Sequence, residues 1–205
     1  MFSHGRTWIR TLARTGVTVW LLGLAAIVAM LMVGHLVALP KPDRTDPELK
    51  AALASLRAPA SGRPAGWMAV HVLGAECDCS RRIAEHLLDT KRPAGVSEVV
   101  LLVGHDDELA GRLRRRMSVV EVTPAELGQR FHIEAAPLLL AVDPAGAVRY
   151  SGGYTDRKRG PEIEDLRILA QLTGGHEVAA VPVFGCAFGE SLKKDLDPLG
   201  LKGME

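Results

Sequence analysis

Residues 67–89 read WMAVHVLGAECDCSRRIAEHLLD, and two different hydrophobic periodicities meet in this stretch. Its first part, 67–73, is an apolar run typical of a buried strand. From about Cys77 the spacing changes to that of a helix with one apolar and one charged face. The apolar face carries Ile83, Ala84, Leu87 and Leu88. A strand therefore leads directly into a helix, with Cys77 at the junction.

Strand and helix patterns continue to alternate downstream of this unit. Strands are expected over 98–104 and 118–122, and helices over 106–116 and from a capping box at Thr123 to about Phe131. The alternation implies parallel strands. A hairpin of 137–143 and 147–152 follows, and then a helix over 161–172. The order predicts an α/β domain with a central mixed sheet flanked by helices.

The overall composition argues against nucleic acid as a partner. The chain has 205 residues with 25 Lys and Arg against 24 Asp and Glu, a net charge of +1. Nucleic-acid binding normally needs a marked positive charge.

The apolar run 17–39 predicts a membrane anchor. As a helix it would be roughly 34 Å long at 1.5 Å per residue, enough to span a bilayer. Arg6, Arg10 and Arg14 precede it, which favours a cytoplasmic N-terminus over residues 1–16. Its exit lacks a clear cleavage site, so we expect an uncleaved signal anchor. The alternative is a buried helix of a soluble protein.

The remainder divides into a connection and one domain. Residues 40–65 contain five prolines around a short helical piece and read as a tether. Residues 66–205 have the length of a single domain, with a C-terminal extension that contains Cys186.

The element order, with Cys77 at the first strand-to-helix junction and Pro137 just before the hairpin, resembles the thioredoxin superfamily. The resemblance covers about residues 66–175. It implies a thioredoxin-like fold, with Cys77 as the reactive thiol at a helix start and a cis Ala136–Pro137 bond packed beside it.

The motif around Cys77 departs from the usual Cys-x-x-Cys. In CDCSR, residues 77–81, Ser80 stands at the position of the second cysteine and Cys79 lies between. A Cys77–Cys79 disulfide would close a tighter and more strained ring. The remaining thiol, Cys186, offers a second route to a disulfide. It could resolve a mixed disulfide at either Cys77 or Cys79.

Three linked motifs resemble the bacterial membrane-associated or secreted thioredoxin-like proteins of RedB type. They are CDCSR at 77–81, SGGYTDRKRG at 151–160 and VFGC at 183–186. With the predicted anchor, the resemblance implies a single-pass protein of the bacterial inner membrane whose domain faces the periplasm.

The cysteines support one leading function and several alternatives. The leading one is a thiol-disulfide oxidoreductase without a cofactor: Cys77 attacks the disulfide of a protein partner, and Cys79 or Cys186 resolves the mixed disulfide. A module that binds or delivers copper through Cys77, Cys79 and possibly Cys186 is the second. Small buried cysteines, or a permanent disulfide to Cys186, would be purely structural.

His71 lies six residues before Cys77, where many thioredoxins carry a buried carboxylate. An imidazole there could exchange the proton that a resolving thiol loses. The alternative is a strand histidine held by a hydrogen bond to the backbone or to water.

Overall fold

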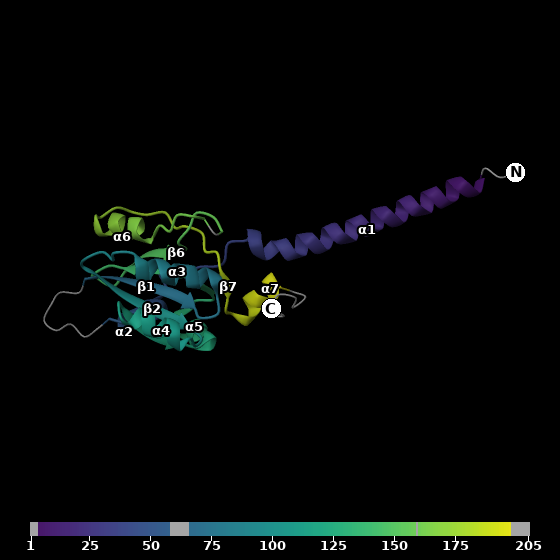
Figure 1. Ribbon diagram of the computed structural model, residues 1–205. Helices are drawn as coiled ribbons and strands as arrows, with labels where there is room; N and C mark the ends of the chain where they lie inside the picture. The colour runs from purple at the N-terminus through teal and green to yellow at the C-terminus, as the bar shows by residue number, and fades with distance from the viewer. Residues whose placement is uncertain (1–3, 58–65, 159, 198–205) are drawn as a thin grey trace. The chain divides into compact units, whose positions relative to one another are not determined.

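The computed structural model describes residues 4–57, 66–158 and 160–197, with side chains described over 13–29 and from 37 onward (Figure 1). The chain divides into two compact units. One is Ala38–Asp195, which contains the sheet. The other includes the N-terminal helix α1, His4–Leu36.

The predicted membrane span, 17–39, falls largely on α1. The exposed fractions of its apolar side chains are high where they are described, at 66% for Trp20 and 54% for Ile27. Side chains 30–36 of the predicted span lie outside the described residues. Within the described part of the chain, no helix has the length and apolar character needed to cross a membrane.

A five-stranded mixed sheet forms the centre of the second unit, in the order β3-β2-β1-β5-β6. The strands are β1 (Trp67–Gly74), β2 (Val96–Val103), β3 (Ser118–Val122), β5 (Leu138–Val142) and β6 (Val148–Gly152). β1, β2 and β3 are parallel, and β5 is antiparallel to both β1 and β6. The predicted mixed α/β architecture is confirmed, and its topology is consistent with a thioredoxin-like fold.

Helices cover both faces of the sheet. They are α3 (Asp78–Asp89), α4 (Asp107–Arg114), α5 (Pro124–Phe131) and α6 (Asp165–Thr173). Alternate residues of β1, Ala69 and Leu73, join side chains of α3, α4 and α6 in one core cluster. The intervening residues Val70 and Val72 are equally buried but lie outside this cluster. β1 is therefore enclosed on both faces, which explains its unbroken apolar run.

The capping box at the start of α5 forms as predicted. The Glu126 N–H donates to Thr123 Oγ1, and the Thr123 N–H donates to Glu126 Oε2 at 2.7 Å. The turn of the β5–β6 hairpin also forms, with Gly146 at φ 89°, a backbone region that a side chain disfavours.

The structure differs from the expected tether over 40–57. Helix α2, Pro47–Ser55, buries Leu49 and Leu53 completely or nearly so and packs against α5. Leu39 pairs with Val183 in an isolated bridge. Two leucines one turn apart supply an apolar face, so this segment is part of the folded domain. Residues 58–65 of the expected tether lie outside the described residues.

The C-terminal extension adds a second, two-stranded sheet that the sequence patterns do not signal. β4 (Ala135–Ala136) pairs antiparallel with β7 (Cys186–Ala187), and α7 (Glu190–Leu196) follows. The extension thereby reaches the segment directly before Pro137.

Candidate active site

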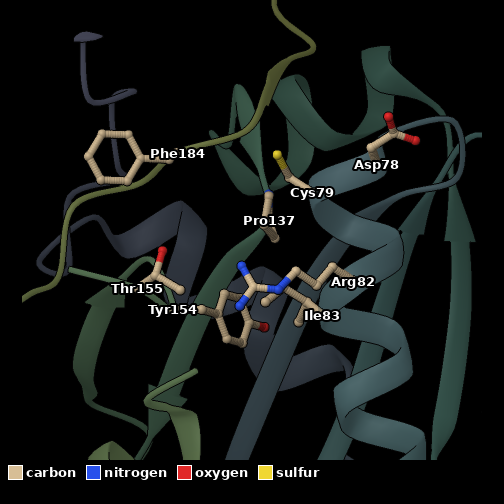
Figure 2. Close-up of a pocket in the computed structure, with 8 residues that line it drawn as sticks. All are labelled: Asp78, Cys79, Arg82, Ile83, Pro137, Tyr154, Thr155 and Phe184. Carbon is tan, nitrogen blue, oxygen red and sulfur yellow. The ribbon is translucent and has the colours of Figure 1, made fainter. Parts of the chain in front are cut away.

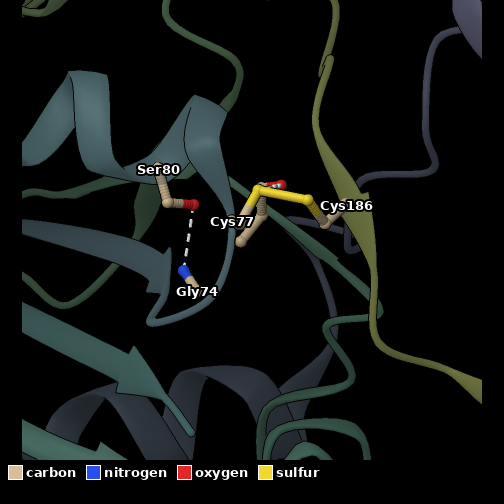
Figure 3. The surroundings of a disulfide bond; sticks show 5 residues. Gly74, Cys77, Ser80 and Cys186 are labelled. Atoms are coloured by element: carbon tan, nitrogen blue, oxygen red, sulfur yellow. Dashed lines mark hydrogen bonds between the residues drawn. A yellow bond between two sulfur atoms is a disulfide. The ribbon is translucent and has the colours of Figure 1, made fainter. Parts of the chain in front are cut away.

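The first strand-to-helix junction holds a disulfide between Cys77 and Cys186 (Figure 3). Cys77 is the N-cap residue of α3 and only 2% exposed. Its partner is 109 residues away in the sequence, and the two Cα atoms are 6.2 Å apart. This distance is normal for a disulfide.

The strand pair β4–β7 brings Cys186 to this place. In the register of the pair, Cys186 lies opposite Ala136. The Ala136–Pro137 bond is cis, as the resemblance implied. Cys77 Sγ lies 4.0 Å from the Ala136 carbonyl oxygen, so the disulfide and the cis-proline segment are in contact.

Ser80 has a structural place beside the disulfide. It is completely buried, and its Oγ accepts a hydrogen bond of 2.9 Å from the Gly74 N–H (Figure 3). Gly74 ends β1, so this bond ties the first turn of α3 to the end of the strand. A hydroxyl at the usual second-cysteine position thus stabilises the loop that presents Cys77.

Cys79 is a free thiol that is partly exposed. It lines a pocket of about 360 Å³ next to Pro137 (Figure 2). The other lining residues are Asp78, Arg82, Ile83, Tyr154, Thr155 and Phe184. The three cysteines are therefore divided between a closed pair and a thiol that faces an open cavity.

Arg82 of α3 connects the pocket with the segment after β6. Arg82 donates from one guanidinium nitrogen to the carbonyls of Gly160 and Pro161, at 2.6 and 3.1 Å. These residues follow Tyr154 and Thr155, which line the same pocket. Tyr154 and Thr155 of the motif at 151–160 thus form part of the pocket wall. The sequence motifs at 151–160 and 183–186 include Tyr154, Thr155 and Phe184, but no local pattern signalled Arg82.

His71 is completely buried on the same sheet face as the α3 core contacts. Its Nδ1 lies 2.8 Å from the Tyr154 hydroxyl, whereas Nε2 has no hydrogen-bond partner. Burial, and then the positive charge of Arg92, lower the pKa of His71 to about 3. The imidazole is therefore neutral and a weak base at neutral pH.

Tyr154 connects His71 with the pocket. Its side chain lines the cavity while its hydroxyl meets the imidazole inside. Burial raises the pKa of Tyr154 well above its ordinary value, so the hydroxyl keeps its proton. The partner of His71 is thus a side-chain hydroxyl and not the backbone or water partner of the simpler expectation, and its part in proton exchange stays a prediction.

Sequence reasoning missed a buried ionic cluster between α3 and α6. Asp165, fully buried at the start of α6, lies 2.8 Å from His86 and 2.7 Å from Arg92. Arg92 also binds Glu98 at 2.9 Å. These residues are far apart in the sequence and belong to separate elements, so no local spacing reveals them. The cluster joins the end of α3 to α6.

The three cysteines do not form a metal site while Cys77 and Cys186 are joined in a disulfide. A disulfide offers no thiolate ligands. In the part of the chain that the structure describes, no group of three or more His, Cys, Asp or Glu side chains is arranged to hold a metal ion.

Comparisons with known proteins show similarity at the level of solved structures. No protein-family model matches the chain, and no curated protein matches it. A hypothetical protein from Sinorhizobium meliloti 1021 is 16% identical, with a TM-score of 0.49, over 75% of this chain and 91% of that one. An uncharacterized conserved protein from Geobacillus kaustophilus is also 16% identical, with a TM-score of 0.48, over 60% of this chain and 76% of that one.

The thioredoxin domain of a thiol-disulfide oxidoreductase from Bacteroides vulgatus is 16% identical as well. Its TM-score is 0.36, over 43% of this chain and 70% of that one.

Proposed function

We propose that this protein is a thiol-disulfide oxidoreductase whose redox couple is Cys77 and Cys186. The observation that carries the proposal is their disulfide at the start of α3, in contact with the segment before the cis Pro137. A helix N-terminus stabilises a nearby thiolate, which makes Cys77 the better nucleophile and the better leaving group.

The reaction exchanges one disulfide for another. In the reduced protein the Cys77 thiolate attacks a partner disulfide, forming a mixed disulfide and releasing one partner thiolate. Cys186 then loses its proton and attacks Cys77 Sγ, which releases the second partner thiolate and restores Cys77–Cys186. The partner gains two electrons, and the protein loses two. The reverse sequence oxidises a partner dithiol.

Cys186 is the resolving thiol in this proposal, because it is already bonded to Cys77. Cys79 remains free at the pocket beside them. Its exposure makes it available to partners without opening the disulfide.

The proposal extends to location. The apolar run 17–39, with the arginines before it, supports a single-pass anchor in the bacterial inner membrane and a domain on the periplasmic side. An oxidising compartment suits a protein that stores a disulfide. The partner is then an exported protein with thiols or a disulfide, and the near-neutral net charge gives no support to a nucleic-acid partner.

The decisive test is thiol mapping of the purified full chain. Mass spectrometry should find a Cys77–Cys186 disulfide that reduces and reforms reversibly in a redox buffer, with a defined reduction potential. Cys77→Ser should abolish catalysed exchange with a protein disulfide, because the nucleophile is gone. Cys79→Ser is the matched control and should retain the Cys77–Cys186 couple.

Two outcomes would overturn the proposal. One is three free and unreactive thiols in the oxidised protein. The other is a stoichiometric metal ion that copurifies with the chain and blocks exchange, which would favour the metal-binding alternative.

A further inference from the structure

A second cavity lies at the end of the sheet opposite to the redox cysteine. Its volume is about 900 Å³, within the usual range for sites that bind small molecules. Trp67, the first residue of β1, and Val148, the first residue of β6, line it, whereas Cys77 follows the last residue of β1. The eight residues of β1 separate its two ends by roughly 23 Å. The cavity is therefore distinct from the redox site.

Segments far apart in the sequence form the walls of this cavity. Apart from Trp67, its lining residues come from the ranges 44–50, 143–149 and 172–179. The first range leads into α2, the second contains the β5–β6 turn, and the third includes the end of α6. Only the folded domain brings these ranges together, so no local sequence pattern reveals the cavity.

Hydrogen bonds fix Arg44 at the wall of the cavity. The N–H and the hydroxyl of Thr45 both donate to the Asp43 carboxylate at 2.8 Å, which holds the backbone in a turn. The Arg44 side chain donates from Nη1 to the Arg149 carbonyl of β6 at 2.9 Å. The guanidinium group is therefore held beside β6 before any ligand binds.

Several hydrogen-bond donors of the lining remain available. Arg44 uses one of its N–H groups on the Arg149 carbonyl, and a guanidinium has five. The Lys50 ammonium and the Trp67 indole N–H both belong to the lining, and neither donates to any group in the part of the chain that the structure describes. These three side chains have donors and no acceptor, so they match an anion.

Most acceptors of the lining are already occupied. The Asp143 carboxylate accepts from the Ala147 N–H at 2.9 Å and from Arg149 Nε at 2.6 Å. The last carbonyls of α6 accept from the N–H groups of residues 174–176, so this helix end is capped. Glu177 also lines the cavity, and its carboxylate is exposed. Free donors thus outnumber free acceptors, which favours a negatively charged ligand.

The cavity also has an apolar side. Leu172 of α6 is buried, and Trp67 and Val178 are partly buried around it. All three belong to the lining or the core cluster beside it. An apolar surface next to available cationic donors suits a ligand that combines an anionic group with an apolar body.

We propose that this cavity binds a small amphipathic anion, a carboxylate or phosphate group joined to an apolar body. Arg44 and Lys50 bind the anionic group by charge-assisted hydrogen bonds, and the apolar body lies against Trp67. A soluble organic acid and the headgroup region of an anionic lipid share this chemistry. The inference does not depend on the Cys77–Cys186 couple, and it adds a binding function to the chain.

Tryptophan fluorescence tests the cavity. The chain has three tryptophans, so full-length Trp8→Phe/Trp20→Phe protein reports on Trp67 alone. Hexanoate and dihexanoyl phosphatidylglycerol, each below its critical micelle concentration, should change this fluorescence saturably. Hexanol and dihexanoyl phosphatidylcholine are their matched analogues without net charge. They should bind at least about tenfold more weakly, because they lack the charge-assisted interaction.

Substitutions at the lining give the direction of each effect. In the same background, Lys50→Met should weaken binding of the anions at least about tenfold, and Lys50→Arg should retain it. Glu177→Gln should strengthen binding, because it removes a repelling carboxylate. Lys193→Met on α7 is the matched control, since Lys193 pairs with Glu190 and is not part of the lining. Circular dichroism establishes that each variant is folded.

The two anions distinguish the sources of the ligand. Saturable binding of hexanoate indicates a soluble organic acid, and saturable binding of dihexanoyl phosphatidylglycerol alone indicates a lipid headgroup. Equal affinity for the charged and uncharged analogues, or no saturable change with either anion, would overturn the inference. So would unchanged affinity in a folded Lys50→Met variant. None of these results bears on thiol exchange at Cys77, so the proposed function is tested separately.

Discussion

The most unusual residue near the site is His71, a buried histidine with one unpartnered nitrogen. Nδ1 meets the Tyr154 hydroxyl, and Nε2 meets no hydrogen-bond partner. A buried polar atom without a partner costs stability, so the position is retained at a cost of about 1–3 kcal/mol. The same burial lowers the pKa of His71, so the free energy of unfolding depends on the protonation of this side chain.

The stability of the protein should depend on pH through His71. Its pKa is about 3 in the folded protein, against 6.5 for an ordinary histidine. Between these values the unfolded chain binds a proton that the folded chain does not, so stability increases with pH and is lost as pH falls below 6.5. We expect this group to lower the free energy of unfolding by about 2 kcal/mol from pH 7 to pH 5.

Urea titrations at several pH values measure this slope, and His71→Asn should flatten it. His105 is the control, because it is exposed and hydrogen bonding to Glu121 raises its pKa, an effect of opposite sign. His105→Asn should make stability increase slightly more steeply with pH. An unchanged slope in His71→Asn would contradict the buried neutral imidazole.

At the scale of elements, α2 should behave as part of the domain. Leu49 is completely buried where α2 packs against α5. Leu49→Ala should lower the free energy of unfolding by about 2–5 kcal/mol, measured by denaturant titration. The control is Ala51→Ser on the exposed face of the same helix, expected to change it by about 0.5 kcal/mol. Equal effects of the two substitutions would show that the segment is a tether after all.

The elements differ in how far local sequence predicted them. The alternation around Cys77 and the capping box at Thr123 predicted β1, α3 and the start of α5, because periodicity and capping are properties of neighbouring residues. The predicted helix 161–172 begins later, at Asp165. The pair β4–β7 escaped prediction, since two-residue strands have no periodicity and form only where distant segments meet.

The whole molecule is expected to combine an anchor with an exported domain. Full-length protein in bacterial cells should stay with the membrane after an alkaline carbonate wash, whereas a chain without residues 1–37 should not.

The free thiol of Cys79 is partly exposed, so a membrane-impermeant maleimide should label it in cells whose outer membrane is permeable. Labelling only after cell lysis would contradict the periplasmic orientation, and release by carbonate would contradict the anchor.

The sequence alone determined the order of β1, β2, β3, β5 and β6 and of the helices between them, because hydrophobic periodicity and turn residues act over a few positions. The resemblance to the thioredoxin superfamily indicated Cys77 as the candidate nucleophile and Pro137 as the proline beside it. Tertiary structure alone decided that Cys186 is the partner of Cys77 and that Cys79 faces a pocket. A disulfide needs two Cα atoms within about 7 Å, and only the pairing of β7 with β4 brings residues 109 apart in the sequence to that distance.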